Sequence, residues 1–325
     1  MKKYRVTLFV LLVVILSACR GQTIHLPEGT DESVLISHLK DTKLSVMSED
    51  GESVTQTEIE VSVAGIARID SDRVAFTTKD QSPLYLLDTS SGDLKEWEQV
   101  GSGVNELLYD SDSGYLYLAD SVNSSVQVFD TEKGEVIEEV MVGQLPLSMA
   151  ADEEGMLYVV NQKSSTVSVI NMENHQVERE YPVPYLPEGI WVRDQKVYIG
   201  GHGPVHGELN RYVYELDAKS GEQLSRIQVG LMPVKLFSPE SSSDLFVVCH
   251  GSHEVYKLPF SNPENSERLE VGANPYDMTG DGGALYVSNV DSDSLSIIDP
   301  VSFQIVKEVS IEGGPAAIVK GGDPE

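Results

Sequence analysis

Four of the seven histidines in this 325-residue chain fall within two short stretches that also contain glycine. His202 and His206 are separated by three residues, while His250 and His253 are separated by two and come just after Cys249. Imidazole nitrogens and thiolates are ligands that zinc, copper and nickel prefer, and glycine lets a loop bend toward a ligand. These residue types therefore suggest a metal site, with Zn or Cu as the candidate ion, or acid–base chemistry. The alternative is that the histidines are solvated loop residues beside a buried thiol.

A repeat in the chain determines whether these histidines can share a site. Five prolines recur in similar local contexts at spacings of 41, 46, 42 and 40 residues, and they are Pro146, Pro187, Pro233, Pro275 and Pro315. Each of the first four is followed by an apolar segment, a second segment of alternating polarity, a turn and a further segment. Alternation with a period of two and enrichment in Val, Ile and Tyr favour β-strands over helices. Each repeat is therefore predicted to contain four short strands.

Four antiparallel strands at a period of about 40–45 residues are typical of one blade of a β-propeller. Six full repeats cover residues 65–103, 104–146, 147–187, 188–233, 234–275 and 276–315. The segment 33–64 matches only the last three strands of a repeat, and 316–320 matches only the first strand. We therefore predict an all-β, seven-bladed β-propeller, closed by one C-terminal strand that joins three N-terminal strands. Such a closure removes the open edges of the ring.

Recurring short motifs give the repeats a resemblance to a known family. Leu157-Tyr158-Val159-Val160-Asn161 and Leu285-Tyr286-Val287-Ser288-Asn289 are followed by strands of the form Ser-x-Val-x-Val-Ile, and Val-Gly-x-x-Pro loops join the repeats. This pattern resembles the YVTN family of seven-bladed β-propellers over about residues 33–320. The resemblance implies the fold. It implies no single activity, because the family includes binding proteins and relatives of cofactor enzymes.

The channel of the expected ring contains charged residues. The position two residues after each repeat proline, or its equivalent, enters the strand that lines the channel, and these positions are Glu106, Ser148, Gly189, Lys235, Asp277 and Ala317. Glu106, Lys235 and Asp277 could orient a small ligand or a cation at the channel mouth. The alternative is that they are polar residues of a water-filled channel.

The two histidine loops should lie on the same face as this mouth. In a propeller the loops that contain the repeat prolines and the loops between second and third strands share one face, which we call the top face. Aligning the repeats places His202 and His250 at equivalent positions of neighbouring blades, with His206 and His253 in the loops beyond. The fold could therefore bring the four side chains to one sector of the top face.

The first nineteen residues have the features of a bacterial lipoprotein signal peptide. Lys2, Lys3 and Arg5 precede an apolar stretch at 6–16, which is too short for a permanent membrane-spanning helix. The stretch Leu16-Ser17-Ala18-Cys19 resembles a lipobox, in which the cysteine is diacylated and becomes the new N-terminus. Two acyl chains anchor a protein stably. The alternative is an ordinary secretory signal with a chance cysteine.

These features predict the organisation and location of the chain. We expect a signal peptide at 1–19 with lipidation of Cys19, a tether at 20–32, and a single propeller domain at 33–325. The mature protein would be extracytoplasmic and lipid-anchored to the bacterial cell membrane, or to the outer membrane in a diderm cell.

The charge of the chain limits its partners. It has 23 basic and 52 acidic residues, a net charge of −29, and losing residues 1–19 would remove three basic residues and no acidic one, leaving −32. Such a surface repels phosphate backbones, so nucleic acid is not an expected partner. The acidic surface also favours a monomer. With only two cysteines, the chain is not a disulfide scaffold.

No nucleophile elbow, phosphate-binding loop or haem-attachment motif is present in the sequence. We therefore assign no catalytic residue and expect a binding or interaction scaffold in the cell envelope, with an unknown envelope protein or small ligand as its partner. The alternative is a metal-binding or metal-dependent envelope enzyme of the lyase or hydrolase type, using the four histidines.

Overall fold

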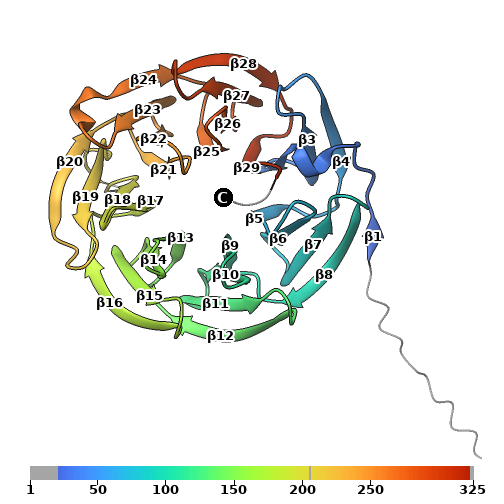
Figure 1. Ribbon diagram of the computed structural model, residues 1–325, viewed down its shortest axis with the longest axis horizontal. Helices are drawn as coiled ribbons and strands as arrows, with labels where there is room; N and C mark the ends of the chain where they lie inside the picture. The colour runs from blue at the N-terminus through green and yellow to red at the C-terminus, as the bar shows by residue number, and fades with distance from the viewer. Residues whose placement is uncertain (1–20, 205, 323–325) are drawn as a thin grey trace, which may run out of the picture.

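The computed structural model describes residues 21–204 and 206–322, and it shows seven four-stranded antiparallel blades arranged in a ring around a central channel (Figure 1). The prediction of an all-β, seven-bladed propeller is confirmed. The predicted signal peptide and Cys19 lie outside the described residues. Within the described part of the chain, no helix has the length and apolar character needed to cross a membrane.

Each of the first six blades is formed by four strands that follow one another in the chain. Blade 1 contains β5 (Val63–Arg68), β6 (Arg73–Thr78), β7 (Pro83–Asp88) and β8 (Asp93–Gln99). Blade 2 contains β9 (Val104–Asp110), β10 (Tyr115–Asp120), β11 (Ser125–Asp130) and β12 (Glu135–Met141). Blade 3 contains β13 (Pro146–Ala151), β14 (Met156–Asn161), β15 (Thr166–Asn171) and β16 (Gln176–Pro182).

The next three blades repeat the arrangement. Blade 4 contains β17 (Pro187–Arg193), β18 (Lys196–Gly201), β19 (Tyr212–Asp217) and β20 (Gln223–Gln228). Blade 5 contains β21 (Pro233–Phe237), β22 (Asp244–Cys249), β23 (Glu254–Pro259) and β24 (Glu267–Glu270), with a short 3-10 turn at Pro263–Asn265. Blade 6 contains β25 (Pro275–Gly280), β26 (Leu285–Asn289), β27 (Ser294–Asp299) and β28 (Gln304–Ser310).

Blade 7 is shared between the two ends of the described chain, as predicted. It contains β29 (Pro315–Val319), β2 (Val34–His38), β3 (Lys43–Met47) and β4 (Val54–Glu58) in that spatial order. Leu35 pairs with Val319 and Ile36 with Ile318, so a C-terminal strand closes the sheet begun by N-terminal strands. The closure leaves no unpaired innermost strand in the ring.

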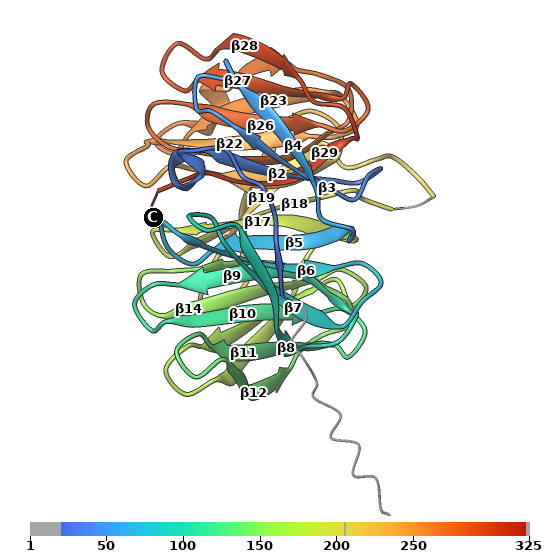
Figure 2. The same cartoon turned by 90° about the vertical axis from the view of Figure 1, so that its right-hand side faces the viewer.

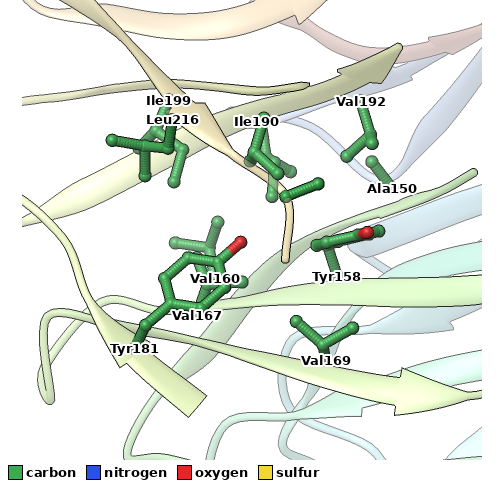
Figure 3. Packing of buried hydrophobic residues seen from close by; sticks show 12 residues of the cluster. Ala150, Tyr158, Val160, Val167, Val169, Tyr181, Ile190, Val192, Ile199 and Leu216 are labelled. Carbon is green, nitrogen blue, oxygen red and sulfur yellow. The ribbon is translucent and has the colours of Figure 1, made fainter. Parts of the chain in front are cut away.

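The core lies between the blades, because each sheet has two apolar faces that only its neighbours can cover. Between blades 3 and 4, for example, Tyr158, Val160 and Val167 pack against Ile190 and Ile199 (Figure 3). The Tyr158 hydroxyl donates a hydrogen bond to Asp152 Oδ2 at 2.9 Å, so its polar end is satisfied.

Residues 21–32, predicted as a tether, lie against the ring. A two-residue strand, β1 (Gln22–Thr23), pairs with β8 and becomes a fifth strand at the outer edge of blade 1 (Figure 1). Ile24 is buried and donates a backbone hydrogen bond to Gly92 O at 2.8 Å, and a 3-10 turn at Thr30–Glu32 leads into blade 7. The chain is therefore fixed to the rim of the ring from Gln22 onward.

Candidate functional site

The innermost strands bring the three predicted channel residues together. The innermost strands of the blades surround the channel, so equivalent positions of these strands can meet there. Glu106 of β9, Lys235 of β21 and Asp277 of β25 all lie two positions after the start of their strands and line one central cavity of about 570 Å³. The ring of strands thus places charges of both signs around one space.

Lys235 and Asp277 form an ion pair between blades 5 and 6. The Lys235 ammonium lies 2.8 Å from Asp277 Oδ1, and the same carboxylate accepts backbone N–H bonds from Met278 at 2.8 Å and Ile318 at 3.0 Å. Burial lowers the pKa of Lys235, but the carboxylates of Asp277 and Glu106 outweigh it and raise the pKa. Lys235 therefore stays protonated, and Asp277 links three blades.

Glu106 differs from Asp277 because its carboxylate makes no hydrogen bond or ion pair with the described residues. Burial in the channel raises the pKa of Glu106 to about 7. The charge of Lys235 opposes this shift, and the carboxylates of Asp277 and Glu188 add to it. Glu106 thus changes charge near neutral pH. Carboxyl groups with this property occur often at binding and catalytic sites.

A second polar group lies on the top face, where His202 meets Glu188. His202 Nδ1 lies 2.9 Å from Glu188 Oε2, and this neighbouring carboxylate raises the pKa of His202 despite its burial. The rings of His202 and His250 are 6.0 Å apart and nearly perpendicular. Burial and the neighbouring His202 lower the pKa of His250. The two imidazoles therefore differ in basicity, with His202 the more readily protonated.

The other two predicted metal ligands do not join this pair. His206 is exposed, in the loop between β18 and β19 that projects further than its neighbours in Figure 2. His253 Nδ1 instead accepts a hydrogen bond from the backbone N–H of Asn274 at 3.0 Å. Cys249 is fully buried, and burial raises the pKa of its thiol. Across residues 21–204 and 206–322, no three His, Cys, Asp or Glu side chains gather in an arrangement that could hold a metal ion.

Sequence reasoning did not identify Glu188 as the partner of His202. Glu188 follows the repeat proline Pro187 directly, one position before the residues that were aligned as the channel ring. Glu188 stands at the start of an innermost strand, next to a top-face loop. That position could have indicated that its carboxylate lies near the histidine loops.

Replacing Glu188 with glutamine should lower the pKa of His202, because the neighbouring negative charge that favours imidazolium is removed. NMR titration of the imidazole C–H resonances measures this change. Glu208→Gln, an exposed substitution in the same loop as His202, serves as the control and should leave the His202 titration unchanged. An unchanged His202 pKa in the Glu188 variant would show that the pair does not form in solution.

Comparison with known proteins supports the fold. No protein-family model matches the chain, and no curated protein matches it either. A functionally unknown protein from Desulfotomaculum acetoxidans is similar in structure, with 13% identity, 90% of this chain and 100% of that chain covered, and a TM-score of 0.74. Dihydro-heme d1 dehydrogenase NirN in complex with DHE is also similar, with 12% identity, 92% and 77% covered, and a TM-score of 0.68.

A third similar structure is virginiamycin B lyase from Staphylococcus aureus, with 15% identity, 77% of this chain and 84% of that chain covered, and a TM-score of 0.65. At these identities the likeness shows the propeller fold alone. The names of these proteins cover different roles, so the fold does not select one of them for this chain.

Proposed function

We propose that this protein is a lipid-anchored, extracytoplasmic β-propeller of the YVTN type that acts as a binding scaffold in the bacterial cell envelope. The observation that supports a binding role is the charged channel, in which Glu106, Lys235 and Asp277 surround one cavity within a closed ring. Rigid rings of strands position loops and channel residues for recognition. The partner is an envelope protein or a small ligand rather than nucleic acid, and the scaffold acts as a monomer.

The location follows from the lipobox-like stretch that ends at Cys19. Cys19→Ala should abolish acylation and release the protein from the membrane, because the anchor is the two acyl chains on this residue. Labelling with a clickable palmitate analogue, followed by fractionation of the expressing bacterium, tests this. Cys249→Ala is the matched control and should still be labelled. Equal membrane association of the wild type and the Cys19 variant would contradict the anchor without bearing on the binding role.

Site-specific crosslinking tests the binding role, because it shows which face of the ring contacts a partner. A photo-crosslinking amino acid is placed at Tyr185, exposed in the top-face loop between β16 and β17, or at Tyr276, exposed beside the central cavity at the start of β25. The comparison position is Val301, exposed in the loop between β27 and β28 on the opposite face. A scaffold that uses the top face should give a defined crosslinked species in cells only from the two tyrosine positions. Crosslinking from Val301 alone would place the binding surface on the wrong face.

A metal-dependent envelope enzyme is the second candidate, favoured by the closeness of His202 and His250. Such an enzyme would carry Zn or Cu on these residues, with His206 and His253 moving toward them. Elemental analysis of the protein beginning at residue 20 should then find stoichiometric metal that a His202→Ala/His250→Ala double variant loses. Absence of metal, together with an unchanged Tm when Zn or Cu is added, would exclude this candidate.

A further inference from the structure

A second space with partly apolar walls adjoins the charged channel cavity. Its apolar walls include Leu108, Ala150, Trp191 and Phe237, each four positions after the start of its innermost strand.

This chamber has a volume of about 360 Å³ and lies between blades 2 and 5, and Asp110 and Ser111 also line it. It continues from the larger cavity, because Glu106, Ser148 and Lys235 line both. The chamber has room because Ser148 and Ala150 of β13 and Gly189 of β17 are small. Its volume falls within the range of small-molecule sites.

Aromatic side chains form one wall of the chamber. Trp191 and Phe237 are half-buried, and their rings pack edge to face with centroids 5.9 Å apart, so each holds the other in place. Tyr109 also lines the chamber. Aromatic faces attract cations as well as apolar groups.

The charge at the end of this chamber is unbalanced. Lys235 is engaged by Asp277 at 2.8 Å, and that carboxylate also accepts two backbone N–H groups. The Glu106 carboxylate borders the same space and, within the described residues, has no such partner. The open charge is therefore negative, in a protein whose net charge is −29. An anion entering the chamber would be repelled, and a neutral molecule would leave the carboxylate unpaired.

We propose that this chamber binds a small organic cation, an ammonium group joined to an apolar or aromatic body. The ammonium pairs with Glu106, and the body packs against Trp191 and Phe237. This proposal goes beyond the scaffold function and depends neither on the lipid anchor nor on a protein partner.

Trp191 provides a direct signal for the test. The chain has two tryptophans, and the other, Trp97, packs against Phe129 between blades 1 and 2 with ring centroids 4.7 Å apart. Trp97→Phe keeps an aromatic ring there and leaves Trp191 as the single reporter. The probe is 2-phenylethylammonium, with 2-phenylethanol as its neutral analogue and 3-phenylpropionate as its anionic analogue, at about pH 8, where Glu106 is ionised.

Saturable quenching or enhancement of Trp191 fluorescence is expected with 2-phenylethylammonium, with binding about tenfold or more tighter than that of the alcohol and no binding of the propionate. Equal binding of the ammonium and the alcohol would overturn the proposal. So would the absence of saturation with the ammonium up to about 10 mM, a concentration that covers even weak specific sites.

Two variants distinguish a specific role of the Glu106 carboxylate in binding from an effect of the overall charge of the protein. Glu106→Gln should weaken 2-phenylethylammonium binding by about tenfold or more. Glu138→Gln removes one negative charge from the exposed face of β12 in the same blade and should leave binding unchanged. Urea unfolding of both variants confirms that they are folded. Equal binding by the wild type and the Glu106 variant would show that the ammonium does not pair with this carboxylate.

Discussion

A chain that ends at Gly314 should fail to form the cooperative ring. It lacks β29, whose pairing with β2 closes blade 7 and whose Ala316 and Ile318 are buried. Asp277 would also lose the backbone N–H of Ile318. The apolar surface and hydrogen bonds lost with this strand amount to roughly 5 kcal/mol or more, which is comparable with the whole stability of a typical domain.

The matched control is a chain that ends at Gly322, which keeps β29 and every residue that the structure describes at this end. Thermal unfolding followed by circular dichroism should show one sharp transition for the control and a broad or absent transition for the shorter chain. A peptide of residues 312–322, added to the shorter chain, should restore the transition by occupying the vacant edge of β2. Identical melting of the two chains would show that closure contributes nothing to stability.

Glu106→Gln should stabilise the protein at about pH 8 and have little effect near pH 4.5. The pKa of this carboxyl is raised from 4.5 to about 7 in the folded state, so the folded protein holds the proton more tightly than the unfolded chain. The stability linked to this proton is fully present below the unfolded pKa and is lost as the pH rises through about 7. A neutral glutamine avoids that loss.

The free energy of unfolding should increase by roughly 1–3 kcal/mol at about pH 8. The upper value converts the whole pKa shift into free energy, and the lower value allows for screening by water in the channel. Urea unfolding of the wild type and of Glu106→Gln, measured at several pH values between about 4.5 and 8, gives the difference directly. Glu138→Gln, on the exposed outer strand, is the control for the loss of one surface charge. A Glu106 variant whose stabilisation is largest at low pH would contradict the expected direction of the pH dependence.

Most of the fold could be predicted because the same signal recurs around the ring. The repeat assigned to 104–146 contains β9 to β12 between Val104 and Met141, and the closing strand expected at 316–320 is Pro315–Val319. The strand boundaries assigned in one repeat therefore support those assigned in the others. By contrast, β1 consists of two polar residues without alternation, and only its long-range pairing with β8 makes it a strand.

The candidate site could be predicted only where equivalent positions recur in several repeats. Glu106, Lys235 and Asp277 were identified because their positions repeat from blade to blade. Glu188 was missed because it lies one position before the aligned ring, inside a register shift that β17 shares with β21 and β25, where spacing along the sequence does not give the direction of a side chain. The four histidines were grouped by loop, but loops carry no periodic signal. His253 instead accepts a hydrogen bond from the backbone N–H of Asn274 in a neighbouring loop.

The attachment of β1 to the edge of blade 1 has a consequence for orientation. Only two residues separate Cys19 from Gln22, a span of at most about 10 Å. A lipid on Cys19 would therefore keep the outer edge of blade 1 close to the headgroups. An anchor at this edge covers neither mouth of the channel. A ligand could enter from either side, and a neighbouring membrane protein could contact either face.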